Sequence, residues 1–422
     1  MFKRATAGRL LATAGIGVTL ALVASGCSSA GGDGGKVTIE FMPVTSANLT
    51  AEFWGEIVDG FEAENPNIDV EYNTGSAEDF NAFSKTLYAA GKLPDVLTVL
   101  NTDLAQLGAL APLDSDSVEP FRNVDDIKLD GVNYYVPTAL QPQSLLWYNK
   151  DLFTAAGLDP ENPPTTIKEL DAAVHALKAV TPVPFAFTGE WTSGFQIASM
   201  ALPRVMDGDP DWYAQRLAGD VTFAGSGWED NAKMLAGWNS EGLLGEGVLS
   251  KGADSGGQEF IAGGSGIYPM GVWYGATLAA ADPGFEVGVF PMPTESGDPA
   301  LSVEFSLNYA ISADSKHPAE AKKLLTYVTQ NKDAVAKQLA KDGLFSNAKE
   351  PVTYELSGPL PQVADLLTKV EFVASRTGSG DAVPPPGFAD WLTQSAQSLI
   401  LGDVDPASYA KNFDDWWDAN QE

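Results

Sequence analysis

The side chains that could do chemistry are very unequally represented in this chain of 422 residues. It contains 10 tryptophans, 12 tyrosines and 56 acidic residues, but only two histidines and one cysteine. An indole ring offers a large, rigid apolar plate, and the polar ends of Asp, Glu, Asn and Gln can form hydrogen bonds with hydroxyl groups.

Catalytic constellations are scarce by comparison. His175 lies on a helical pattern and His317 at a predicted helix start, so we predict neither a histidine-based triad nor a two-histidine metal site. The sequence has no GxSxG, HExxH or Walker motif. Among 56 acidic residues a glycosidase-like carboxylate pair can always be imagined, so a secreted glycoside hydrolase stays an alternative. The sequence favours a protein that is not an enzyme and needs no cofactor or metal.

The single cysteine, Cys27, follows an N-terminal segment that has the features of a targeting signal. Basic residues come first, and the apolar run at residues 10–24 is shorter than the roughly 20 residues that span a bilayer. The segment resembles a bacterial lipoprotein signal, which is cut before a cysteine whose thiol then carries lipid. This resemblance implies a signal peptide at residues 1–26, lipidation of Cys27 and a flexible tether at residues 27–36. The alternative is an ordinary signal followed by an incidental cysteine.

The charge and the length constrain what remains. The formal net charge is −31, and the first 26 residues contain three basic and no acidic side chains. Such a surface repels nucleic acid and anionic lipid, and argues weakly against a strongly anionic ligand. Without a second cysteine no internal disulfide can form, so the fold must depend on its core. A chain of this length predicts two domains or one very large one.

Strand and helix patterns alternate along the chain. Residues 36–41 and 68–72 alternate apolar and polar positions, and residues 93–100 form a continuous apolar run typical of a strand buried on both faces. Helical spacing fills the segments between them, which predicts an α/β fold with parallel pairing. Further strands are predicted at residues 144–149 and 285–293. Further helices are predicted after Thr166 (with Glu169 as a capping box), after His317, from about Trp391 to Leu401, and after Pro406.

Four clusters of residues carry a family resemblance. They are FEAENPNIDVEY with AAGKLPDVLTV and LGALAPLD, then GVNYYVP with LLWYNKDLFTAAGLDPENPPTTIKEL, then FIAGGSGIYPMGVW, and finally SKHPAEAKKLLTYVTQN. The sequence resembles the family 1 extracellular solute-binding proteins, which are sugar-binding lipoproteins of ABC importers and are similar to maltose-binding protein. The clusters follow the order of the family and cover nearly the whole chain after the tether.

The resemblance implies a two-lobe, type II periplasmic-binding-protein-like α/β fold with the ligand cleft between the lobes and several hinge crossovers. The lobe boundaries that we expect are residues 37–139 plus 307–350 for the first lobe and residues 140–306 plus 351–422 for the second. Residues 137–141 are the first hinge candidate.

The resemblance also suggests which residues contact the ligand. In α/β lobes ligands lie beyond the carboxyl ends of strands, which points to Ser46, Asn101 and Asp103 in the first lobe. Gln141 and Gln143 lie in the crossing segment, where the family often has a polar contact.

Aromatic residues dominate the candidates of the second lobe. Trp273 lies in a Gly-x-Trp turn, Trp191 follows Glu190 in a loop, and Trp391 starts a late helix. Core packing is the alternative for each tryptophan. The weaker companions are Glu190, Tyr274, Glu304 and Arg376, and an exposed ion pair is the alternative for Arg376.

The function that the resemblance implies is that of a receptor. The protein would capture a neutral sugar, a disaccharide or oligosaccharide, by lobe closure and deliver it to the permease of an ABC transporter. We expect a monomer held by lipid on the extracellular face of the membrane of a Gram-positive bacterium, with no nucleic acid as partner. A protein that binds a non-sugar solute, such as a polyol or a phosphodiester, is a further alternative.

Overall fold

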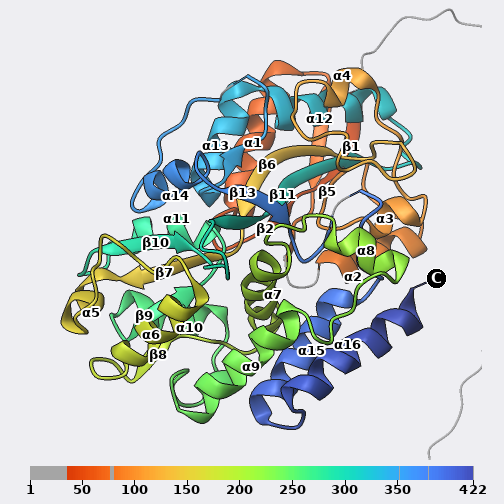
Figure 1. Ribbon diagram of the computed structural model, residues 1–422. Helices are drawn as coiled ribbons and strands as arrows, with labels where there is room; N and C mark the ends of the chain where they lie inside the picture. The colour runs from red at the N-terminus through yellow and green to blue at the C-terminus, as the bar shows by residue number, and fades with distance from the viewer. Residues whose placement is uncertain (1–35, 77–79, 351, 379, 422) are drawn as a thin grey trace, which may run out of the picture. The chain divides into compact units, whose positions relative to one another are not determined.

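Two β-sheets organise this protein in the computed structural model (Figure 1). The structure describes residues 36–76, 80–350, 352–378 and 380–421, which belong to one unit that begins at Lys36. The predicted signal peptide, Cys27 and nearly all of the tether lie outside the described residues. Within these ranges no helix is long and apolar enough to cross a membrane. The α/β fold class is confirmed.

The larger sheet contains the strands predicted in the first part of the chain. Its seven described strands have the order β12-β6-β11-β5-β1-β3, with β13 beside β11. Their bounds are β1 (Val37–Met42), β3 (Ile68–Tyr72), β5 (Val96–Val99), β6 (Val136–Pro142), β11 (Ala300–Ile311), β12 (Phe345–Ser346) and β13 (Glu371–Ala374). β1 is parallel to β3 and β5, as predicted, whereas β11 is antiparallel to β5 and β6.

The smaller sheet is built from the middle of the chain. Its described strands have the order β10-β7-β9-β8, with β7 antiparallel to both of its neighbours. The bounds are β7 (Leu145–Asn149), β8 (Val183–Phe185), β9 (Ser265–Pro269) and β10 (Val287–Pro291), and a separate small pair joins β2 (Val44–Thr45) to β4 (Gly75–Ser76). The strands predicted at residues 144–149 and 285–293 are therefore confirmed as β7 and β10.

Amphipathic helices cover both sheets. The helices around the larger sheet are α1 (Ala51–Glu64), α2 (Phe80–Ala89), α3 (Asp103–Gln106), α4 (Ser115–Val118), α12 (Pro318–Gln330) and α13 (Lys332–Asp342). Those around the smaller sheet are α5 (Lys150–Ala155), α6 (Ile167–Leu177), α10 (Ala253–Ile261), α11 (Trp273–Ala281) and α14 (Leu360–Leu366). The predicted capping box of α6 is present, because Thr166 and Glu169 each accept a hydrogen bond from the other's backbone.

A third group of helices packs together and draws its members from distant parts of the chain. It consists of α7 (Trp191–Val205), α8 (Trp212–Ala218), α9 (Gly227–Ser240), α15 (Phe388–Leu401) and α16 (Pro406–Asn420), and the short helix η1 (Val248–Ser250) precedes α10. α7 packs on α9 and α15, and α16 packs on α9. The two predicted C-terminal helices are α15 and α16, and the first begins at Phe388, before the expected Trp391.

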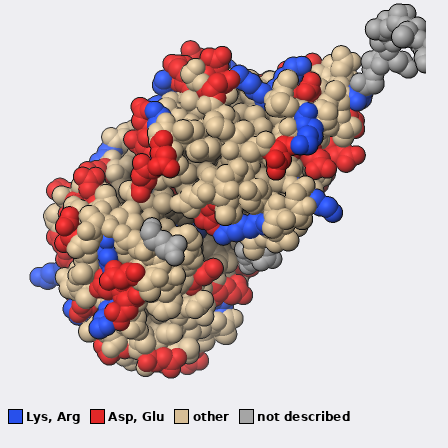
Figure 2. All heavy atoms as spheres, turned by 90° about the vertical axis from the view of Figure 1, so that its right-hand side faces the viewer, with Lys and Arg blue, Asp and Glu red and all other residues tan. Residues whose placement is uncertain are grey.

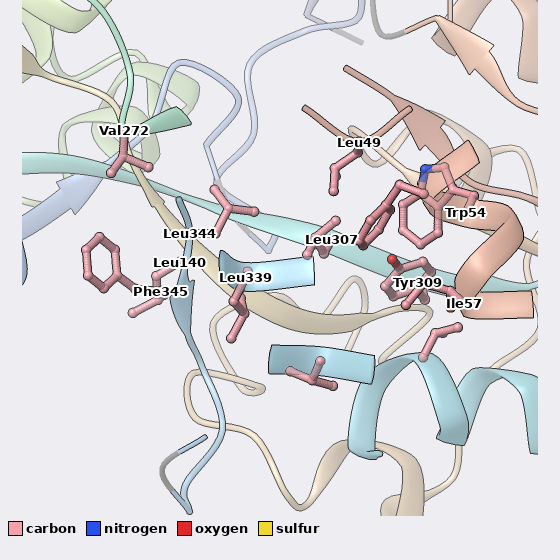
Figure 3. Close-up of a cluster of buried hydrophobic side chains, with 14 of the residues drawn as sticks. Leu49, Trp54, Ile57, Leu140, Val272, Leu307, Tyr309, Leu339, Leu344 and Phe345 are labelled. Atoms are coloured by element: carbon pink, nitrogen blue, oxygen red, sulfur yellow. The ribbon is translucent and has the colours of Figure 1, made fainter. Parts of the chain in front are cut away.

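The chain passes between the two sheets where β6 leads into β7 and where β10 leads into β11. The hinge candidate at residues 137–141 lies inside β6 and pairs with β11. An apolar cluster runs past these crossings, with Val272, Leu140 and Phe345 at one end and Trp54 with Tyr309 at the other (Figure 3). Because this packing is continuous, the two sheets share part of their core.

The charge of the chain is visible at its surface. Acidic side chains are spread over the face seen in Figure 2, and basic side chains are fewer. This distribution agrees with the formal net charge of −31.

Candidate functional site

The residues predicted to contact a ligand fall into three groups in the structure. The first is a polar group near the start of β11, the second is an aromatic pair at two helix starts, and the third consists of residues packed elsewhere. The polar group contains Gln141, Gln143, Glu304 and Asn101, and Asp103 and Arg376 lie close in the sequence to residues that line its cavity. The aromatic pair is Trp191 and Trp273, with Glu190 and Ser46 near it. The residues packed elsewhere are Tyr274 and Trp391.

The polar group is held together by the pairing of β6 with β11. Gln141 and Glu304 are direct partners in this antiparallel ladder. The side-chain amide of Gln143 donates to the carboxylate of Glu304 and, at 3.4 Å, to Oε1 of Gln141. Thr377, which follows β13, donates from Oγ1 to the other oxygen of Glu304 at 2.7 Å. Glu304 therefore connects three chain segments that are far apart in the sequence.

A small cavity opens beside Glu304. Its polar wall comes from the end of β5, from β11 and from the segment after β13, and consists of Asn101, Thr102, Tyr135, Glu304, Asn308 and Thr377. Its volume is about 30 Å³, room for one or two water molecules, whereas ligand pockets commonly measure about 300–1,000 Å³. This cavity is too small to hold a ligand of ordinary size.

Two candidates at the end of β5 are already engaged. The carboxylate of Asp103 forms an ion pair with Lys85 of α2, and Oδ1 of Asn101 accepts from the backbone N–H of Asp103 at 3.1 Å. Both residues are only partly buried. The ion pair compensates the charge of Asp103, so a ligand contact there would be shared with Lys85.

Arg376 lies next to Thr377 and is partly buried. Its Nε is buried without a hydrogen-bond partner, and the described part of the chain offers it no ion pair. The alternative to a ligand contact for Arg376 was an exposed ion pair, and none is present among the described residues.

The aromatic pair brings together two segments that are about eighty residues apart. Trp191 begins α7, Trp273 begins α11, and both pack on Phe195. The ring centroids lie 5.9 Å and 5.3 Å from that of Phe195, with edge-to-face angles of 65° and 61°. Both tryptophans are only partly buried, so each keeps accessible surface that a sugar ring could cover.

Glu190 sets the direction in which Trp191 leaves its loop. Its φ of 57° lies in the left-handed region, which a residue with a side chain adopts only at a cost of about 1–3 kcal/mol. The turn is held by the side chain of Ser193, which donates to the carbonyl of Glu190 at 2.8 Å. The carboxylate of Glu190 lies against Gly252, where a Cβ atom would come within 2.2 Å of Oε2. Strain of this kind is frequent at functional sites.

Asp342 is a residue that the sequence reasoning missed. Its Oδ1 accepts hydrogen bonds from Ser46 at 3.2 Å and from the side-chain amide of Asn48 at 2.9 Å. The amide of Asn48 also approaches the carbonyl oxygen of Trp273 at 3.5 Å. Asp342, at the end of α13, thus holds the loop after β2, and Asn48 of that loop reaches the start of α11.

The environment of Asp342 changes its acidity. The residue is 6% exposed, and burial raises the pKa of its carboxyl to about 6, although the hydrogen bonds from Asn48 and Ser46 act in the opposite direction. In the sequence it ends a helix just before Gly343, a position that looks like an ordinary helix terminus. No local pattern distinguishes it.

Tyr274 and Trp391 pack against the protein itself. Tyr274 is buried, its hydroxyl donates to the carbonyl of Gly257 at 2.7 Å, and desolvation raises its pKa. Trp391 stacks on Trp416 of α16 with a centroid distance of 5.7 Å and an angle of 8°. One face of the Trp391 ring is therefore covered, as in the core-packing alternative for this residue.

The protein has two β-sheets that are covered by helices and joined by crossing strands, with polar and aromatic side chains near the crossings. This is the architecture of the two-lobe solute-binding proteins. The model of the bacterial extracellular solute-binding protein family matches residues 46–335. The chain belongs to this family, as its sequence clusters predicted.

Several relatives of known sequence are similar over most of their length. A binding protein of Brucella abortus (strain 2308) is 25% identical over 376 residues, covering 86% of this chain and 88% of its own. The multiple sugar-binding protein of Streptococcus mutans is 26% identical over 371 residues, with 80% of each chain covered. An sn-glycerol-3-phosphate-binding periplasmic protein of Shigella flexneri is 26% identical over a shorter match of 205 residues. This match covers 43% of this chain and 45% of the relative.

Solved structures show the same fold. A chitin oligosaccharide binding protein superposes with a TM-score of 0.79 at 21% identity, covering 92% of this chain and 99% of its own. The protein RafE in complex with raffinose gives a TM-score of 0.74 at 20% identity, with 92% and 100% covered. At these identities the likeness concerns the fold.

The buried carboxyl of Asp342 predicts a specific pH dependence of stability. Because its pKa is raised, the native protein binds more protons than the unfolded chain between about pH 4 and 6, so the free energy of unfolding falls as the pH rises through this window. Asp342→Asn keeps the acceptor for Ser46 and Asn48 but cannot ionise. We expect the free energy of unfolding of this variant to lose the pH dependence that Asp342 causes. At pH 7.5 its free energy of unfolding should equal or exceed that of the wild type, by up to about 3 kcal/mol for a shift of two pKa units.

Urea unfolding at pH 4.5 and pH 7.5 measures this difference. Ser46→Ala is the companion variant: it removes one donor to the carboxylate, so it should raise the pKa of Asp342 further and move the window to higher pH. Identical pH slopes for the wild type and Asp342→Asn would contradict the assignment.

Proposed function

We propose that this protein is an extracellular receptor that captures a neutral saccharide, a disaccharide or oligosaccharide, and delivers it to the permease of an ABC transporter. The observation that carries the proposal is the meeting of Trp191 and Trp273 on Phe195 in a chain whose crossing strands carry a polar cavity. Flat aromatic plates cover the apolar faces of a sugar, and polar side chains bond its hydroxyl groups. The sugar-binding relative from Streptococcus mutans supports the same ligand class.

The proposed mechanism makes and breaks no covalent bond. The lobes of the proposal are residues 37–139 plus 307–350 and residues 140–306 plus 351–422, and the larger sheet extends past these bounds through the ends of β6 and β11 and through β13. The lobes would move about the crossing strands β6 and β11. A sugar that contacts both lobes binds the closed arrangement more tightly than the open one, so it shifts the population toward closure.

The site residues of the proposal are those gathered near the crossings. The polar contacts are Glu304, Gln141, Gln143, Asn101 and Asp103, with Ser46 and Glu190 near the aromatic pair. The anchoring part of the proposal rests on the sequence: lipid on Cys27 would hold a monomeric receptor on the outer face of the cell membrane of a Gram-positive bacterium.

A thermal-shift screen tests the ligand class. The panel contains raffinose, stachyose, D-tagatose, xylotriose and triacetylchitotriose, with sn-glycerol 3-phosphate and glucuronic acid as anionic members. We expect at least one neutral saccharide to raise the melting temperature, since a ligand at 100 times its Kd adds about 2.7 kcal/mol to the free energy of unfolding. Chromatography of the incubated saccharide should recover it unchanged. A shift with sn-glycerol 3-phosphate alone, or conversion of a saccharide to products, would refute the proposal.

Trp273→Ala tests the aromatic plate. Removing the indole should weaken binding of the strongest saccharide of the panel at least tenfold in titration calorimetry, because stacking on the ring is lost while the fold persists. Trp416→Ala is the matched control, since it removes a partly buried indole from α16, which packs on Trp391 and not on Phe195. An unchanged affinity of Trp273→Ala would remove this residue from the site.

A further inference from the structure

Two hydrogen-bond acceptors on β11 line the same cavity. Glu304 accepts from Gln143 and Thr377, and within the described residues it forms no ion pair. Asn308 is 8% exposed, and its Oδ1 is buried without a hydrogen-bond partner. Its amide nitrogen is occupied, because it donates to the carbonyl of Phe305 at 3.0 Å. The cavity is therefore lined by one uncompensated carboxylate and one unused acceptor.

The backbone of β11 places these acceptors on one wall. Both residues line the cavity, although the chain between them is not regular strand throughout. Leu307, which lies between them, has a φ of 48° while its side chain is 3% exposed, and it is skipped in the ladder between β6 and β11. A buried leucine in the left-handed region is rare and marks a position that the surrounding structure enforces. Here it directly precedes Asn308.

The chemistry of Glu304 and Asn308 determines which ligand groups they can bind. A buried acceptor without a donor costs free energy that a donating group recovers. A carboxylate strengthens hydrogen bonds from neutral donors and repels anions. Lys85, the cation near the end of β5, is engaged by Asp103, and Arg376, which precedes Thr377, is not among the described residues that line the cavity. A group that carries hydroxyl donors and no negative charge therefore fits this wall.

We propose that Glu304 and Asn308 are the selectivity residues of the receptor: they accept hydrogen bonds from two hydroxyl groups of the saccharide and reject ligands that carry phosphate or carboxylate. This inference rests on the proposed function and deepens it. If it is right, this chain differs in the charge of its ligand from the sn-glycerol-3-phosphate-binding relative.

Titration calorimetry with Glu304→Gln tests the inference. The glutamine has the same shape and can keep partners for Gln143 and Thr377, but it has no charge. With the strongest neutral saccharide of the panel, we expect Kd to rise at least tenfold while the melting temperature without saccharide stays within about 2 °C of the wild type, as for a charge-assisted hydrogen bond lost without a cavity. Sn-glycerol 3-phosphate should not bind the wild type. In Glu304→Gln the affinity for the saccharide should exceed the affinity for sn-glycerol 3-phosphate by a smaller factor than in the wild type.

Glu62→Gln is the matched control. Its carboxylate is partly buried and accepts from the backbone N–H of Val70 at 2.8 Å, in α1 and away from the cavity. This variant should bind the saccharide as the wild type does. A crystal structure of the wild type with the saccharide provides a second readout, which does not depend on the folding of any variant. It should place hydroxyl oxygens within about 3.2 Å of Glu304 and of Asn308 Oδ1.

Three outcomes decide the matter. If the wild type binds a neutral saccharide and Glu304→Gln binds it equally well, the inference is wrong and the proposed function stands. If the crystal structure of the complex has only water against Glu304 and Asn308, the inference is wrong again. If the wild type binds no neutral saccharide, the proposed function fails and the selectivity assignment falls with it.

Discussion

The antiparallel pairing of β6 with β11 is the interaction on which the rest of the structure depends. These strands lie about 160 residues apart in the sequence, yet their register brings Gln141 opposite Glu304 and Leu140 opposite Phe305. On one side of the pairing the chain continues into the smaller sheet, and on the other β11 completes the larger sheet by pairing with β5. Any relative motion of the two sheets must therefore bend this ladder or turn about its ends.

The proposed function divides ligand recognition between two kinds of contact. Apolar contact would come from Trp191 and Trp273, which lie at helix starts and share Phe195. Polar contact would come from the carboxylate of Glu304 and the Oδ1 atom of Asn308 on β11. Asp342 holds the loop after β2 through its bonds to Ser46 and Asn48, and Asn48 also contacts the backbone of Trp273. Stacking alone would hold many rings, whereas buried polar partners impose selectivity.

Local patterns predicted the local structure well, whereas the contacts within the candidate site join residues that are far apart in the sequence. The alternation in β1 and β3, the apolar run of β5 and the capping box of α6 are set by neighbouring residues, so the sequence was sufficient. Asp342 was missed because its partners lie about 300 positions away. The position of Tyr274 could have been anticipated: consecutive helix residues point about 100° apart, so Tyr274 and Trp273 at the start of α11 cannot face the same way. Trp391 meets Trp416 on a separate helix, a contact that spacing alone does not specify.

The central claim is that the sheets close on a saccharide about the β6–β11 ladder. Small-angle X-ray scattering, recorded with and without the saccharide that binds most tightly, tests it most directly. The account predicts a smaller radius of gyration with saccharide than without it. An unchanged profile, under conditions in which calorimetry shows the site to be filled, would contradict it.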